Sequence, residues 1–344
     1  MAVQASGVAT ILDVLQTMGP DGKQMEIAEV LTQQNELLDD MTWREGNTVT
    51  GHRDAVRTSL PTPSFRAINE GVPVTKAGST PIEETAALLE DFSRVDRELA
   101  IMSGDVNAYR LREGRPHIIG MGHKLATTVF YGNSNLDPRG FTGLAPRYNT
   151  LNTATSNTAY NVINAGGTGS NLRSIWLIGW SEDTITGIYP KNTMGGLDHE
   201  DVTNASGTGA HGFPAAASLA DASGNKFMGY EDHWIWRCGL MVKDWRYAVR
   251  IANIDPSTLT LAATTGANLT DLMTQALEQI ENLNGVRAAF YVPRALRAYL
   301  RRQMQQQKGT FMSWDDQGGK RILNFGEVPV RRTDALNVAE AQVV

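Results

Sequence analysis

Residues 42–80 most restrict the architecture, because they predict strands but contribute almost nothing to a core. Thr and Val side chains that favour strands precede a Leu-Pro-Thr-Pro break at residues 60–63, and residues 71–80 return to strand and turn composition. The most economical interpretation is a long two-stranded ribbon. An isolated ribbon of two strands is marginally stable in water. This segment therefore needs a covering surface, supplied by its own subunit or by the next one.

The composition is that of a folded protein and excludes several classes. Of 344 residues, 41 % are hydrophobic, and the formal net charge of −6 disfavours a globally basic nucleic-acid binder. The single cysteine, Cys238, excludes an intramolecular disulfide framework and a Cys-rich zinc site. No apolar run reaches the roughly 20 residues that span a bilayer, and the N-terminus lacks a secretory signal pattern. We expect a protein of a reducing cytoplasm with no membrane segment.

Glycine is enriched, with 33 residues in the chain. Most of the excess lies in residues 149–172 and 192–226, which are rich in Asn, Thr, Gly, Ala and Ser and poor in large apolar and charged side chains. Loops of this length are uncommon in a compact monomer. They suit surface that packs against other copies of the chain, although a disordered insertion is an alternative interpretation.

Charge is unevenly distributed along the first 80 residues. Residues 1–45 carry eight acids and two bases, whereas residues 46–80 carry four bases and two acids. An acidic arm beside a basic ribbon indicates either pairing within the fold or complementarity between neighbouring subunits. The candidate contacts between subunits are Arg53, Arg57, Arg66 and Lys76 on the basic side and Asp39 and Asp40 on the acidic side.

The periodicity of apolar residues predicts an α+β fold with no internal repeat. Helical spacing is found at residues 9–18, 23–41, 82–103, 106–131, 268–283 and 294–307. Strand patterns are found at residues 174–180, 184–189, 233–243, 245–252, 288–292, 322–325 and 328–332. Residues 181–183 read as a turn between the first two of these strands, and Pro293 occupies the favoured first position of a helix.

Motifs for catalysis are absent from the sequence. The Gly-rich residues 166–171 lack the Lys-Ser/Thr pair that holds phosphate and magnesium, and there is no nucleophile elbow or His-Glu-x-x-His pattern. Asp198–Asp201 is the densest ligand-like cluster, and it is either a solvated loop or a site for a divalent ion at a subunit contact. Cys238 lies within a predicted strand and reads as a buried thiol. We therefore expect no enzyme, no cofactor and no metal centre.

One helix face is basic. Arg294, Arg297 and Arg301 recur at spacings of three and four and so share a face of the helix that follows Pro293. This face is either solvated or directed at polyanions or acidic partners. Aromatic residues do not interleave with the basic run, so sequence-specific reading of nucleic acid is not supported.

The order of these elements resembles the major capsid proteins of tailed bacteriophages, whose fold was first described for phage Hong Kong 97, and among them the coat proteins of short-tailed phages. The resemblance extends over residues 20–335. The segments that carry it are Asp40–Gly46, Thr50–Arg53, Arg57–Pro63, Leu125–Asn133, Phe141–Arg147, Ser174–Trp180, Gly187–Lys191 and Asp244–Asn253.

The resemblance implies five parts. Residues 1–41 would form an N-terminal arm, and residues 42–80 an extended loop that reaches over a neighbouring subunit. Residues 82–140 would form a peripheral domain with a long spine helix, and residues 141–320 an axial domain. Residues 321–344 would return to the peripheral domain as terminal strands.

The resemblance also implies a function, which is self-assembly into an icosahedral shell that encloses the double-stranded DNA of a tailed bacteriophage. Its partners would be other copies in pentamers and hexamers, a portal, a decoration protein and, through non-specific contact, the packaged DNA. Some relatives carry a scaffold segment before the arm, whereas here the expected arm starts with the first residues. The resemblance therefore implies a separate scaffolding protein, unless a scaffold segment has been removed. The shell would assemble in the cytoplasm of the bacterial host and become part of the virion.

Two further expectations follow from the same resemblance. The predicted ribbon has one lysine, Lys76, so covalent cross-linking between subunits is not expected. The alternatives are an encapsulin-like compartment, another virion structural protein such as a tail or decoration protein, and an enzyme with an α+β domain.

Overall fold

The computed structural model describes residues 35–152, 157–203, 214–220, 224–260, 266–306, 312–317 and 320–344. The predicted helix at residues 9–18 and most of the one at residues 23–41 lie outside this part of the chain. The helices are α2 (Leu37–Asp40), α3 (Arg97–Met102), α4 (Val106–Tyr131), α5 (Leu269–Glu278) and α6 (Arg294–Gln306), with short 3₁₀ turns η1 (Thr158–Asn161), η3 (Trp245–Tyr247) and η4 (Asp334–Leu336).

Strands dominate the described part of the chain. They are β1 (Trp43–Glu45), β2 (Gly51–Ser59), β3 (Gly78–Thr85), β4 (Ala87–Asp96), β5 (Val162–Asn164), β6 (Arg173–Trp180), β7 (Ile185–Tyr189), β8 (Leu197–Asp201), β9 (Ala217–Ala220), β10 (Lys226–Val242), β11 (Ala248–Ile254), β12 (Arg287–Val292), β13 (Met312–Gln317), β14 (Lys320–Phe325) and β15 (Val328–Arg332).

The chain divides into two compact units, each assembled from separate segments. Among the described residues, the first unit contains Leu88–Leu125 and Gly196–Arg237. The second contains the described residues up to Ala87 together with Ala126–Gly195 and Cys238–Val344. These two units are defined by which residues lie close together and not by their role in assembly. The five-part division expected from the family resemblance therefore stays a prediction.

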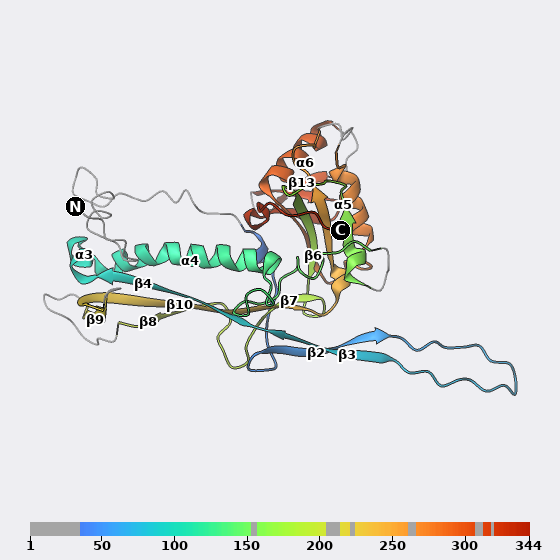
Figure 1. The fold of residues 1–344 in the computed structure, drawn as a ribbon, viewed down its shortest axis with the longest axis horizontal. Coiled ribbons are helices and arrows are strands. Elements are labelled where there is room, and N and C mark those ends of the chain that lie inside the picture. Colours follow the sequence, from blue (N-terminus) through green and yellow to red (C-terminus); the bar gives the residue numbers. More distant parts are fainter. Residues whose placement is uncertain are drawn as a thin grey trace. The chain divides into compact units, whose positions relative to one another are not determined.

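The core of the second unit forms where two amphipathic helices cover a sheet (Figure 1). Strand β6 pairs antiparallel with β11 and β12, and β12 pairs parallel with β15. Leu269, Met273 and Ala276 of α5 and Leu296 and Leu300 of α6 are fully buried against these strands. Helix α5 starts after Asn268, whose side chain accepts the Asp271 N–H, and α6 starts directly after Pro293. Both starts agree with the sequence pattern.

Helix α4 has the length that its sequence predicts. Its 26 residues span about 39 Å at 1.5 Å per residue. The Asp105 carboxylate accepts the N–H groups of Asn107 and Ala108 in the first turn, which satisfies donors that have no partner inside the helix. In the first unit, Gly114 lets the helix approach Trp234 closely, because a Cβ there would lie 3.0 Å from the indole ring.

The predicted helix over residues 82–103 is wrong for most of its length. Residues 78–85 belong to β3, residues 87–96 form β4, and helix begins only at Arg97. Burial along β4 alternates, as in a strand, and Leu88 and Phe92 are 60 % and 47 % exposed. A strand forms here instead of a helix because β10 pairs with β4 in the sheet. The local sequence pattern does not reveal this pairing.

Strands β6 and β7 form as predicted, with a turn at residues 182–183 between them. One parallel pairing, Trp180 with Ile185, joins them, and β7 pairs further with β1 and β10. One further expectation needs correction: the small-residue stretches are not purely loops, because β5 lies in the first and β8 and β9 lie in the second. Strands β5 and β8 pair with longer strands distant in sequence, β11 and β10, whereas β9 pairs with the start of β10, which follows it directly in the chain.

Candidate subunit contact surfaces

The predicted ribbon is observed in part (Figure 1). Strand β2 lies within the expected range and pairs antiparallel with β3 as a separate two-stranded sheet, but β3 runs to Thr85 and only its residues 78–80 fall within residues 42–80. Beyond the paired strands, residues 60–77 form an open loop without regular structure. Its apolar side chains are exposed: Leu60 is 74 % and Ile68 is 91 % exposed, and Phe65 and Val74 are fully so. The ribbon thus presents apolar surface that the described part of its own chain does not cover.

Two ion pairs hold the base of the ribbon to other segments of the second unit. On β2, the Asp54 carboxylate lies 2.7 Å from Lys243 Nζ. On β3, both carboxylate oxygens of Glu84 accept hydrogen bonds from Arg147, at 2.6 and 2.8 Å. Each strand therefore has its own anchor, and we call these two pairs the ribbon clamp.

The clamp is reinforced by a buried histidine. His52 precedes Asp54 on β2, and its Nδ1 accepts the Asn47 N–H. Burial lowers the pKa of His52, and the nearby cations Arg44 and Lys243 act in the same direction. The hydrogen bond from Lys243 lowers the pKa of Asp54. At neutral pH the base of the ribbon therefore combines a neutral imidazole with a charged carboxylate.

The basic residues predicted on the ribbon are all exposed. In the described part of the chain, no hydrogen bond or ion pair engages the side chains of Arg53, Arg57, Arg66 or Lys76. The strand register places Arg53 opposite Glu83, while Arg57 lies opposite Ser79. These side chains are available to another molecule, and their role in contacts between subunits stays a prediction.

The two acidic candidates differ from each other. Asp39 is exposed, whereas Asp40 accepts two hydrogen bonds from Arg331 and one from the Tyr291 hydroxyl. Asp40 therefore has partners within its own chain, where it fastens α2 to β12 and β15. Of the two, Asp39 is the one whose carboxylate is available for a neighbour.

The basic face of α6 is also not uniform. Arg294 is exposed and donates a hydrogen bond to Asp334. Arg301, two helical turns further along α6, is also exposed. Arg297 is half-buried between them, and its Nε has no hydrogen-bond partner in the described part of the chain. The three residues share a face as predicted, but their environments separate Arg297 from the other two.

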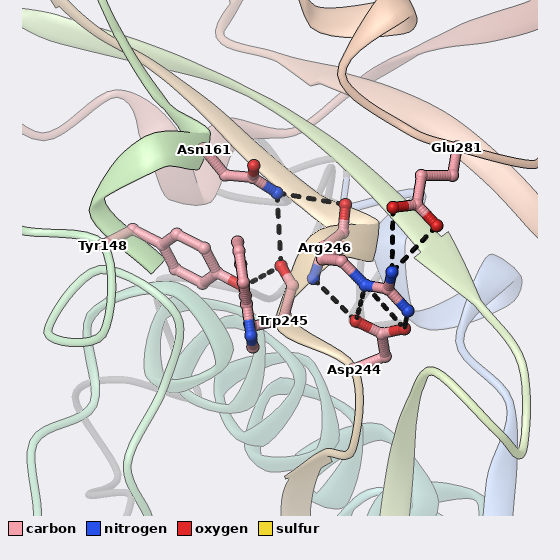
Figure 2. A network of polar contacts seen from close by, with 6 residues as sticks. All are labelled: Tyr148, Asn161, Asp244, Trp245, Arg246 and Glu281. Carbon is pink, nitrogen blue, oxygen red and sulfur yellow. Dashed lines mark hydrogen bonds and ion pairs between the residues drawn. The ribbon is translucent and has the colours of Figure 1, made fainter. Parts of the chain in front are cut away.

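A polar network orients the segment Asp244–Asn253, one of those that carry the family resemblance (Figure 2). The Arg246 guanidinium pairs with both Asp244 and Glu281, and the Asp244 carboxylate raises the pKa of Arg246. Tyr148 donates its hydroxyl to the Trp245 carbonyl at 2.6 Å, and Asn161 donates to the carbonyls of Trp245 and Arg246. The turn that leads into β11 is thus fixed by side chains from three other segments.

The C-terminal residues are anchored inside the second unit. Glu340 accepts hydrogen bonds from Tyr131, Ser174 and Arg250, and its carboxylate and the Arg250 guanidinium are both buried. The Asn253 side chain bonds to both the N–H and the carbonyl of Val343. The end of the chain therefore completes the core, a role for which the sequence offered no signal.

Within the described ranges, the candidates for chemistry do not assemble into a reactive site. Three side chains of the 198–201 cluster have partners: Asp198 pairs with Arg237, Asp201 pairs with Arg110, and His199 Nε2 lies 3.0 Å from Asp232 Oδ1. Among the described residues, no group of His, Cys, Asp or Glu could hold a metal ion. Burial raises the pKa of the Cys238 thiol to about 12, so the thiol is unreactive at neutral pH.

A family model described as "Major capsid protein GP7" matches residues 19–344. The chain belongs to this family. It is a major capsid protein of tailed phages, as the sequence predicts, and the family is structural and not a class of enzymes. No helix in the described ranges combines the length and apolarity needed to cross a membrane.

Solved structures agree with the family. A chain in the near-atomic structure of bacteriophage Epsilon15 matches with 29 % identity and a TM-score of 0.72, covering 100 % of both chains. The bacteriophage JBD30 capsid matches with 15 % identity and a TM-score of 0.50, covering 95 % of this chain and 100 % of that one. The predicted α+β fold of Hong Kong 97 type is thereby confirmed.

The encapsulin alternative gains no support from these comparisons. The SrpI encapsulin of Synechococcus elongatus PCC 7942 matches with 10 % identity and a TM-score of 0.37, a likeness too low to carry an argument. No curated protein sequence matches the chain.

Proposed function

We propose that this capsid protein self-assembles into an icosahedral shell of pentamers and hexamers that encloses a double-stranded DNA genome, and that it catalyses no reaction. The observation that carries this proposal is the ribbon, whose exposed apolar residues have no covering surface in the described part of their own chain. A sister subunit is the covering surface that a shell would provide. The likeness to the JBD30 capsid and to the Epsilon15 structure supports the same conclusion.

The exposed loop would contribute to each contact through apolar burial. At about 25 cal/mol per Å² of apolar area, burial of Leu60, Phe65, Ile68 and Val74 supplies several kcal/mol before the costs of ordering the loop. Arg53, Arg57, Arg66 and Lys76 would then set the register of the contact by pairing with acidic residues such as Asp39 of a neighbour.

The family resemblance supplies roles for the parts of the chain. We infer that residues 1–41 act as an arm, residues 42–80 reach over a neighbour, and residues 82–140 form a peripheral domain. Residues 141–320 would form the axial domain, whose loops meet at five- and six-fold positions, and residues 321–344 would return to the peripheral domain.

Further partners belong to the same proposal. Arg294 and Arg301, which are exposed on α6, would make non-specific contact with packaged DNA. A scaffolding protein, a portal and a decoration protein would take part in building the virion, and assembly would occur in the cytoplasm of the bacterial host.

Electron microscopy of the expressed chain, with and without a co-expressed scaffolding protein, tests the proposal. Closed shells with pentameric and hexameric units are the expected result. Tubes, isolated trimers or a monomer at every concentration would contradict it.

A further inference from the structure

The second unit contains a hollow of about 920 Å³ beside Arg297. Its walls are α2 with the two residues before it, residues 283–289, the start of β15 and the Arg297 side chain. Most of the lining is polar or charged, unlike the apolar pockets that bind small molecules. The hollow therefore resembles the polar part of a protein–protein interface.

Arg297 differs from three nearby arginines, whose side chains have carboxylate partners. Arg331 pairs with Asp40, while Arg332 and Arg294 both pair with Asp334. Arg297 is half-buried, yet within the described residues its Nε meets no acceptor. Asp40 and Asp334 are thus already paired with other arginines.

The electrostatic surroundings of Arg297 agree with this geometry. Burial lowers the pKa of Arg297, and the adjacent cations Arg301, Arg332 and Arg331 act in the same direction, with Glu36 as the opposing carboxylate. Removing a guanidinium group from water without supplying acceptors is unfavourable. A planar guanidinium group that borders an open hollow can bind a carboxylate through two parallel hydrogen bonds, in bidentate geometry.

The charged side chains that line the hollow favour a protein partner over DNA. Four carboxylates, those of Glu36, Asp39, Asp40 and Glu327, oppose the three guanidinium groups in the walls. A continuous polyanion such as DNA would be repelled by these carboxylates, whereas a protein segment can present one acid to Arg297 and bases or amides elsewhere. A second copy of this chain is the protein that a capsid brings to every one of its surfaces.

We propose that the hollow beside Arg297 is a subunit contact that receives a carboxylate side chain from a second copy of this chain. The inference rests on the proposed self-assembly and adds to it a specific surface. It also separates Arg297 from Arg294 and Arg301, to which contact with DNA was assigned above.

The first experiment compares Arg297→Gln with the control Arg302→Gln, at an exposed position of the same helix. We expect Arg297→Gln to keep the melting temperature of the isolated subunit and to raise the subunit concentration needed for shells, by sedimentation, about tenfold or more. Arg302→Gln should assemble at the wild-type concentration. Wild-type assembly of Arg297→Gln would overturn the proposal, and so would a defect confined to DNA-filled particles, which would assign Arg297 to DNA.

A second experiment identifies the source of the carboxylate. Shells of the Arg297→Lys variant, mixed from unlabelled and ¹⁵N-labelled copies, are treated with a zero-length carbodiimide and digested. Cross-linked peptide pairs that join position 297 to an acidic peptide of the other isotope are expected. Pairs of a single isotope only, or no pair at position 297, would overturn the proposal.

The behaviour of the wild-type chain distinguishes failure of this contact from failure of the proposed function. If wild-type subunits never form shells, self-assembly fails and the contact fails with it. If wild-type shells form and Arg297→Gln assembles equally well, the contact alone is refuted.

Discussion

The Arg147 guanidinium group forms a bidentate ion pair with the Glu84 carboxylate: Nη1 donates to Oε1 at 2.6 Å and Nη2 donates to Oε2 at 2.8 Å. The same guanidinium donates from Nε to the Gly143 carbonyl and from Nη2 to the Thr142 carbonyl. Strand β3 is thereby fastened to the segment that follows α4. Because both side chains are largely buried, the contact is shielded from water and salt.

Glu84→Gln should lower the free energy of unfolding of the subunit by about 1–3 kcal/mol, because it leaves a desolvated guanidinium with a weaker acceptor. Urea denaturation measures the change, and a double-mutant cycle with Arg147→Gln isolates the coupling between the two residues. Glu83→Gln, at the adjacent and exposed position of β3, is the control and should be close to neutral. Equal effects at positions 83 and 84 would refute the role given to the Arg147–Glu84 pair in the clamp.

Arg57→Glu should leave the subunit folded and prevent shells from forming. The side chain is exposed and has no partner in the described part of its own chain, so reversing its charge affects only contacts with other molecules. Sedimentation velocity separates shells from subunits, and circular dichroism verifies the fold. Arg139→Glu, at an exposed position outside β2 and β3, is the charge-matched control. If the Arg57 variant forms normal shells, its proposed role in subunit contacts is wrong.

Glu340→Ala should be strongly destabilising, by about 3–5 kcal/mol, because it leaves the Arg250 guanidinium buried without its counter-charge. Thermal or chemical unfolding of the purified subunit measures the loss. Glu327→Ala is the control, since Glu327 is exposed on the turn before β15. A loss no larger than that of the control would show that the C-terminal residues do not complete the core.

Acidification should weaken the base of the ribbon through His52. The pKa of His52 is lower in the folded state than its ordinary value of 6.5, so the folded state binds this proton less readily than the unfolded state. Its contribution to stability is complete above about pH 6.5 and is lost as the pH falls below that value. The lowered pKa of Asp54 acts in the same sense, but only below its ordinary value of 3.8.

Comparison of wild-type protein with His52→Gln tests this pH dependence. The difference in unfolding free energy between the two proteins should be larger at pH 7.5 than at pH 5. Because the other histidines are present in both proteins, their contributions cancel in the difference. A difference that stays constant or grows on acidification would contradict the burial of a neutral His52.

Local patterns predicted those elements whose stability depends on neighbours in sequence. Helix α4 was predicted at its observed limits, Val106–Tyr131, and α6 begins where Pro293 indicates. The ribbon was predicted from strand-forming residues without core partners: β2 lies within the predicted range, whereas the second strand, expected at residues 71–80, is β3 at Gly78–Thr85. Helix α5 ends at Glu278, several residues before the end of the apolar pattern, because pattern does not determine where a helix frays.

The sequence by itself determined the family, the helices with strong periodicity and the presence of strand-forming ribbon residues with few core partners. The tertiary structure decided what depends on residues far apart in the chain. Strand β4 replaces a predicted helix because β10 pairs with it, and Arg147 meets Glu84 across 63 positions while Arg250 meets Glu340 across 90. Periodicity records which side of an element is apolar, but only the folded chain brings a distant charge or a strand edge within bonding distance.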